Sequence, residues 1–334
     1  MTTRRLFVAG VLLLAAALPL LAQQSTEQPN APAVWTPKQE QEREKGQEPP
    51  TTFKVDVKLV NVFVTVVDQQ GAPVAGLVKD NFRLSEDGVP QDIRLFAKES
   101  ELPLSIVVAI DSSLSTRTNI KLELESARRF IHEILRPQDS LSLYQFAEAV
   151  TELVRFTNDM RAIDRGIDRV QIGSATALYD AVYLGSQALE TRHGRKVLVV
   201  ITDGGDTMSQ VDYAEALRAA QGSEAIVYSI IIVPIESSAG RNTGGEHALI
   251  QMSNDTGGKY YYAGSTAELD RAFRQISEQL RTQYLLGYYP KARVSDSDFR
   301  RLEVTLVPAV GEAPAEVRDL HARHRTGYYT SAWH

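Results

Sequence analysis

The chain has 334 residues with a formal net charge of −6 at pH 7, and it contains no cysteine. Without cysteine the protein can form no disulfide and carry no lipoprotein-type lipid anchor, so we expect its stability to come from packing alone. A mildly acidic chain without a basic cluster also argues against nucleic acid as a partner, because affinity for phosphate backbones depends on Lys and Arg.

The first 22 residues have the pattern of a secretory signal peptide. Arg4 and Arg5 give a positive start, residues 6–21 are apolar and uncharged, and Ala22 offers a small residue for cleavage. The apolar run is shorter than the ~20 residues that a membrane-spanning helix needs. We therefore expect a secreted or periplasmic protein with no membrane insertion after signal removal. The alternative is an uncleaved N-terminal anchor.

Two segments of different character follow the signal peptide. Residues 23–50 are rich in Gln, Glu, Lys and Pro, and such a composition buries too little apolar surface to offset the entropy of ordering. A disordered linker is predicted there. Residues 51–98 instead contain strand patterns at 55–59, 60–67, 82–85 and 93–96, with turn residues between 67 and 82 and after 85, which indicates the first part of an antiparallel β-sandwich.

Residues 99–285 alternate apolar strand runs with helical patterns, which favours βαβ units and a mainly parallel sheet. The predicted strands cover residues 106–110, 139–146, 197–201 and 226–233, with a short antiparallel edge at 151–156. The predicted helices cover residues 122–135, 177–189, 213–220 and 269–280. The small and polar residues 235–245 are predicted to form a flexible loop.

Three further strand patterns follow, at residues 283–289, 301–307 and 325–330. Because about four N-terminal strands are too few for an independent core, we expect residues 286–334 to complete one sandwich with residues 51–98. The central α/β domain would then be inserted in, or flanked by, this small antiparallel sandwich. Four tyrosines are expected to pack on its sheet surfaces with outward hydroxyls, the alternative being a ligand-binding surface: Tyr288, Tyr289, Tyr328 and Tyr329.

Three polar loops of the central domain carry candidate ligands for a metal ion. Asp111, Ser113 and Ser115 directly follow one buried strand, Asp203 follows another, and Thr176 lies near the start of a helix between them. Ligands of open α/β sheets bind beyond the carboxyl ends of the strands, and hard divalent cations prefer oxygen ligands. Two carboxylates held together without a cation would repel each other. A metal site is therefore predicted; the alternative is that these residues cap the following helices.

In this order and spacing the five residues resemble the metal-ion-dependent adhesion site (MIDAS) of von Willebrand factor type A (VWFA) domains. All five side-chain positions of that motif are matched, and the resemblance covers roughly residues 100–285. Short flanking segments are also similar to VWFA-related proteins of acidobacteria: residues 74–77, 80–82 and 286–290.

The resemblance implies a Rossmann-like VWFA domain that binds proteins. Asp111, Ser113 and Ser115 would hold a divalent cation, Mg²⁺ first with Mn²⁺ or Ca²⁺ as alternatives. Thr176 would contact the ion in the ligand-engaged state, and Asp203 would do so directly or through water. An Asp or Glu of an unknown protein partner would complete the coordination.

The alternative functions are a metal-dependent hydrolase of the phosphatase kind and a structural envelope protein whose metal only ties loops together. A phosphoryl-transfer site of this type needs a second carboxylate two residues after the first, where this chain has Ser113. The chain also lacks a Gly-x-Ser-x-Gly nucleophile elbow, and no Gly-x-Gly-x-x-Gly follows a strand. We therefore expect a binding module and no enzyme.

Overall fold

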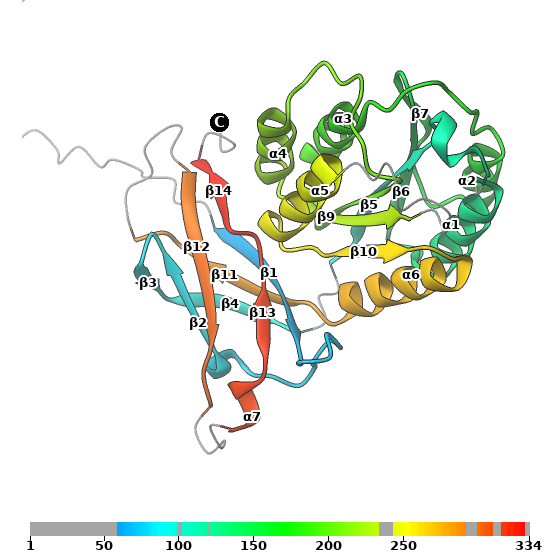
Figure 1. Cartoon of the computed structure of the whole chain (residues 1–334). Coiled ribbons are helices and arrows are strands. Elements are labelled where there is room, and N and C mark those ends of the chain that lie inside the picture. The colour runs from blue at the N-terminus through cyan, green and yellow to red at the C-terminus, as the bar shows by residue number, and fades with distance from the viewer. Residues whose placement is uncertain are drawn as a thin grey trace, which may run out of the picture. The chain divides into compact units, whose positions relative to one another are not determined.

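The structure is a computed structural model, and it describes six stretches of the chain: residues 59–98, 102–118, 120–233, 243–291, 299–309 and 315–330 (Figure 1). The predicted signal peptide (1–22), the predicted linker (23–50), most of the strand pattern at 55–59 and most of the loop predicted at 235–245 lie outside these residues. Among the described helices, none combines the length and the apolar character that crossing a membrane requires.

The central domain is built on a six-stranded sheet with the order β10-β9-β8-β5-β6-β7. Its strands are β5 (Leu104–Asp111), β6 (Ser140–Phe146), β7 (Val150–Thr157), β8 (Arg195–Thr202), β9 (Ile226–Ile232) and β10 (Tyr260–Ala263). All neighbouring strands run parallel except β7, which lies antiparallel to β6 at one edge. The predicted α/β fold with a mainly parallel sheet is confirmed.

Helices cover both faces of this sheet (Figure 1). Those on one face are α1 (Ile120–Ile134), α2 (Met160–Ile167) and α6 (Thr266–Arg281). Those on the other are α3 (Leu178–Glu190), α4 (Tyr213–Gly222) and α5 (Thr243–Asp255). Successive side chains of a strand point to opposite faces, so Ile110 packs in the first core and Ala109 in the second. Burial on both sides explains why β5 reads as a continuous apolar run.

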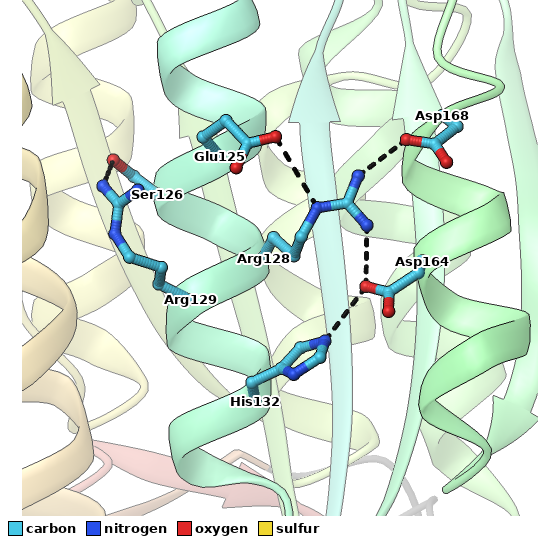
Figure 2. A network of polar contacts seen from close by, with 7 residues as sticks. All are labelled: Glu125, Ser126, Arg128, Arg129, His132, Asp164 and Asp168. Atoms are coloured by element: carbon cyan, nitrogen blue, oxygen red, sulfur yellow. Dashed lines mark hydrogen bonds and ion pairs between the residues drawn. The ribbon is translucent and has the colours of Figure 1, made fainter.

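Charged residues join the outer face of α1 to α2 (Figure 2). Arg128 donates hydrogen bonds to Asp164 at 2.7 Å and to Asp168 at 2.6 Å, and its Nε lies 3.7 Å from Glu125 Oε1. His132 Nε2 lies 3.0 Å from the same Asp164 oxygen. The outer face of α1 is thus charged, while its inner face packs against the sheet.

A second domain consists of two four-stranded antiparallel sheets, ordered β13-β1-β11-β4 and β14-β12-β2-β3. The strands are β1 (Val60–Val67), β2 (Phe82–Glu86), β3 (Val89–Gln91), β4 (Ile93–Ala97), β11 (Tyr284–Tyr288), β12 (Phe299–Leu306), β13 (His321–Arg323) and β14 (Gly327–Tyr329). Strand β1 pairs with β11 and β13, and β2 pairs with β12. Side chains of both sheets share one apolar core, so each half depends on strands from both sides of the central domain.

The expected position of the tyrosines is wrong for two of the four. Tyr288 and Tyr328 are buried in the sandwich core, and both hydroxyls donate to the buried carboxylate of Glu86, that of Tyr328 at 2.8 Å. Tyr289 is exposed and Tyr329 is half-buried, as expected for residues on a sheet surface. The inward hydroxyls have a polar partner in the core, and strand periodicity alone gives no sign of such a partner.

Several short elements were not predicted: β3, β10, β13, α2, α5, α7 (Ala315–Arg318) and the 3₁₀ helices η1 (Lys79–Asn81) and η2 (Leu114–Thr118). Helix α5 begins at Thr243, so the predicted loop is wrong for its last three residues. A Cβ added to Gly245 would lie 1.5 Å from the carbonyl oxygen of Gly204, so the glycine is required for this close approach. The same glycines that suggested a loop therefore allow a helix to pack against the loop after β8.

Candidate functional site

The first loop of the candidate site begins at Asp111, the last residue of β5. The Asp111 side chain is buried, and each of its carboxylate oxygens accepts a hydrogen bond. Oδ1 accepts from the Ser113 backbone N–H at 2.8 Å, and Oδ2 accepts from the Thr202 hydroxyl at 2.6 Å. A carboxylate oxygen has two lone pairs, so these bonds fix the direction of the group and leave further acceptor capacity.

The two serines of this loop bring their hydroxyls together. Ser113 Oγ and Ser115 Oγ are 3.0 Å apart, although Ser113 is buried and Ser115 is exposed. The Thr116 hydroxyl donates to the Ser113 carbonyl at 2.8 Å and holds the start of η2 in place. The first loop thus presents two neighbouring hydroxyl oxygens directly after Asp111.

The second loop, which contains Thr176, is tied by its backbone to both other loops. Gly173 N–H donates to the Ser112 carbonyl at 2.8 Å, and Thr207 N–H donates to the Thr176 carbonyl at 2.9 Å. The Thr176 N–H in turn donates to the Thr207 hydroxyl at 2.9 Å. These bonds place the buried Thr176 between the first loop and the third.

Thr176 does not serve as the N-cap of α3, which was its alternative role. The N-cap position is Ala177, whose side chain cannot accept a hydrogen bond. Asp206 of the third loop replaces it, because its Oδ1 accepts from the N–H groups of Leu178 at 2.9 Å and Tyr179 at 3.3 Å. The Thr176 hydroxyl is therefore not used as a helix cap.

The third loop starts where β8 ends, with Thr202 followed by the half-buried Asp203. The pairing of Ile110 with Ile201 in adjacent parallel strands sets Asp111 opposite Thr202, one residue before Asp203. Among the described residues, none of the hydrogen bonds seen joins the Thr176 hydroxyl or the Asp203 carboxylate directly to the first loop. The five predicted residues thus lie on three adjoining loops, and their convergence on one cation remains a prediction.

Electrostatics link the carboxylates of these loops. Burial raises the pKa of Asp111 to about 6, hydrogen bonds from Thr202 and Ser113 oppose the rise, and the charge of Asp203 adds to it. A third carboxyl group, Glu123 of α1, takes part: burial, and then repulsion from Asp111 and Asp203, raises its pKa to about 8. The negative charges of Asp111 and Asp203 therefore disfavour the ionisation of Glu123 at this edge of the sheet.

Glu123 was not identified from the sequence. Its side chain is 3 % exposed, and within the described part of the chain no group donates a hydrogen bond to its Oε1. Also among the described residues, no three His, Cys, Asp or Glu side chains converge closely enough to hold a metal ion by themselves. The oxygen set at this edge is thus two carboxylates with serine and threonine hydroxyls, and a buried carboxylate oxygen without a donor lies nearby.

The contacts of Thr202, Thr207 and Asp206 at the site were also not predicted from the sequence. Thr202 has a recognisable signal, since a polar residue ending an apolar strand lies beside the residue that ends its parallel neighbour. The cross-loop bonds of Thr207 and Asp206 have no comparable signal, because they depend on how separate loops meet.

Exposed apolar side chains occur on all three loops. Leu114 is 57 % exposed in the first loop, Ile172 is 40 % exposed just before the second, and Met208 is 57 % exposed after the third. Met208 N–H donates to the Thr176 carbonyl at 3.2 Å, which fixes its place beside the second loop. We call Leu114, Ile172 and Met208 the apolar rim.

Comparison with known proteins shows what this part of the chain is similar to. Residues 106–205 match the model of the von Willebrand factor type A domain. An uncharacterized protein of Borreliella burgdorferi is 24 % identical over 200 residues, which is 52 % of this chain and 58 % of that protein. The present chain therefore spans little more than half the length of this relative.

Solved structures with similar folds include a von Willebrand factor type A protein from Catenulispora acidiphila, with a TM-score of 0.48, 12 % identity and coverage of 82 % of this chain and 75 % of that one. The conserved hypothetical protein BatB from Bacteroides thetaiotaomicron has a TM-score of 0.44 and 17 % identity, covering 54 % of this chain and all of its own. The von Willebrand factor domain of the pilus tip protein Mfa5 from Porphyromonas gingivalis has a TM-score of 0.45 and 13 % identity, covering 53 % and 94 %.

Proposed function

From the premise that the central domain of this chain is a von Willebrand factor type A domain, we propose that the protein is an exported, metal-dependent protein-binding module. The observation that carries the proposal is the arrangement of Asp111, the paired hydroxyls of Ser113 and Ser115, and Asp203 at one edge of the sheet. A divalent cation bound there would offer a coordination position to an acidic side chain of a partner.

The residues present suit a hard divalent cation. Asp111, Ser113, Ser115, Thr176 and Asp203 would hold it, since their carboxylate and hydroxyl oxygens are the donors that Mg²⁺ and Mn²⁺ prefer. Mutual repulsion between the buried acids and the lone Oε1 of Glu123 are costs that positive charge at this place would relieve. When bound, the ion would supply Lewis-acid attraction for a carboxylate of the partner.

The apolar rim favours recognition of a protein segment. Leu114, Ile172 and Met208 expose apolar surface on the same three loops that carry the proposed ligands. An acidic residue flanked by apolar residues would match such a surface, because the carboxylate meets the ion while its neighbours cover the rim. A hydrolase has less use for exposed apolar side chains at its metal, and Ser113 stands where a phosphoryl-transfer enzyme needs a second carboxylate.

Export is part of the proposal and depends on the signal-peptide pattern of residues 1–22, which lie outside the described residues. The proposed location is the periplasm or the exterior of the cell. The cation concentration there would keep a Mg²⁺ or Ca²⁺ site filled even at modest affinity.

The test is capture of partners from an envelope extract by the immobilised full chain, in Mg²⁺ and in EDTA. Asp111→Ala should lose every protein whose capture needs Mg²⁺, while Asp92→Ala, which removes an exposed carboxylate of the sandwich, should retain them. Capture that persists undiminished in EDTA would remove the cation from the mechanism.

A second pair of variants separates recognition from the alternative in which the ion only ties loops together. Leu114→Ser and Met208→Ser should keep the Mg²⁺ affinity of the wild type and lose the captured proteins. If both variants capture partners normally, the three loops are not the binding surface, and the ion has a structural role.

A further inference from the structure

Glu123 is the exception on the inner face of α1. The buried residues of this helix follow helical spacing, with Ile120, Glu123, Ala127 and Ile131 turned toward the sheet. The other buried residues of the helix are apolar apart from Ser126, so Glu123 is its one buried residue with an ionisable side chain. A carboxyl group in such a position is costly unless hydrogen bonds or charges compensate it.

The fold provides little compensation. Within the described residues Oε1 of Glu123 accepts no hydrogen bond, and the charged partners available to α1 lie on its opposite face, where Glu125 and Arg128 meet. A buried acceptor without a donor retains the desolvation cost that a hydrogen bond would offset. The structure therefore contains an acceptor whose donor is not part of the described protein.

The position of Glu123 indicates where the missing hydrogen-bond donor would come from. Ile120, one turn before Glu123, packs in the same core as Ile110 and Ile201, and these two residues immediately precede Asp111 and Thr202. The negative charges of Asp111 and Asp203 also act on Glu123. Glu123 is therefore buried, and it lies close enough to the candidate cation site for the charges of Asp111 and Asp203 to act on it.

Among the described residues, no three acidic side chains are close enough to hold an ion, so direct coordination by Glu123 together with Asp111 and Asp203 does not agree with the geometry. An outer position does agree, since a cation-bound water carries two O–H donors and Mg²⁺ usually keeps several waters. We propose that Glu123 is the outer-sphere carboxylate of the cation site and accepts a hydrogen bond from a water bound to the ion. This inference rests on the proposed function.

Glu123 would act as a positioning residue. Hydrogen bonds that outer carboxylates accept orient the inner ligands and raise cation affinity, and their removal typically weakens binding by about 10- to 100-fold. The added negative charge would also hold the ion against loss when no partner is bound.

The experiment measures Mg²⁺ and Mn²⁺ affinity of the full chain by isothermal titration calorimetry for the wild type and three variants. Glu123→Gln should bind both ions about 10- to 100-fold more weakly. The matched control is Glu125→Gln, two residues along the same helix and exposed to solvent, which should stay within about twofold of the wild type. Asp111→Asn should lose binding altogether.

The outcomes separate the two levels of the argument. If Asp111→Asn loses the ion and Glu123→Gln keeps wild-type affinity, the outer-sphere role is refuted and the cation site stands. If Asp111→Asn also keeps wild-type affinity, the proposed site itself is refuted. Urea unfolding in EDTA, run on every variant, verifies folding, and a merely structural Glu123 would leave the Mg²⁺ affinity of the folded variant unchanged.

Discussion

Replacing Glu123 by Gln is expected to stabilise the cation-free protein as the pH rises. Burial, and then repulsion from Asp111 and Asp203, raises the pKa of Glu123 from 4.5 to about 8. Because the folded pKa lies above the unfolded one, the stability linked to this proton is intact below pH 4.5 and is lost as the pH rises through about 8. At about 1.4 kcal/mol per pH unit, the wild type loses about 3 kcal/mol between pH 5 and pH 8 through this group alone.

The assay is urea unfolding of both proteins in EDTA at pH 5, 6, 7 and 8. Gln has the same shape and no charge, so its own packing cost is the same at every pH and cancels when the pH values are compared. The difference in unfolding free energy between variant and wild type should therefore grow by about 3 kcal/mol from pH 5 to pH 8. Asp111, whose pKa is raised to about 6, contributes to both proteins alike.

Glu125→Gln again provides the control, because this exposed side chain should give a difference that stays flat with pH. Parallel curves for wild type and Glu123→Gln would refute the reasoning. They would mean that Glu123 is ionised in the cation-free protein at pH 5 already, or that a donor reaches it.

Two further predictions concern packing and pH. Gly245→Ala should cost about 1–3 kcal/mol or more and weaken Mg²⁺ binding, since its Cβ would meet the Gly204 carbonyl in the loop that carries the proposed ligand Asp203. Gly222→Ala, with no described atom within 4 Å of the new Cβ, should instead gain about 0.5 kcal/mol in urea unfolding. Burial lowers the pKa of His324, whose Nε2 accepts from Val304 N–H at 3.1 Å. The stability linked to the neutral ring is therefore complete above pH ~6.5, and it decreases as the pH falls from that value. A His324→Gln variant should lack this decrease when unfolding curves are measured from about pH 5 to about pH 7.5.

The parts of the fold that sequence predicts well are those buried on two sides. Strands β5, β8 and β9 are continuous apolar runs because helices cover both of their faces, and the polar residues that end them mark the candidate site. Strand β1 was predicted because strongly β-forming residues fill it, and in β12 the apolar Leu302, Val304 and Leu306 alternate with polar residues. The pairing of N-terminal with C-terminal strands across the long insertion could be predicted because neither half of the sandwich has a complete core by itself.

What the sequence could not predict depends on contacts between distant segments. Glu123 fits the outward pattern of a charged helix as well as the inward one, and only the packing of α1 decides between them. The hydroxyls of Tyr288 and Tyr328 turn inward because Glu86 lies between them, three residues that come from different strands. Helix α5 was missed because its glycines, needed for a close backbone contact, are also the residues that indicate loops.

The way the three loops are joined bears on why a cation would be used for recognition. Protein hydrogen bonds already connect them, from Gly173 to Ser112, from Thr207 to Thr176, and from Thr202 to Asp111. Loops that are held by these bonds do not need an ion to connect them. Because they are already ordered, little conformational entropy of the loops would be lost when an ion binds. The acids at the site still repel one another, so the free energy of cation binding is left to relieve that repulsion and to attract a carboxylate from outside. Hydrogen bonds already hold the loops in place, and the charge of a bound ion would be available to attract the partner. This arrangement favours a role of the ion in recognition over a purely structural one.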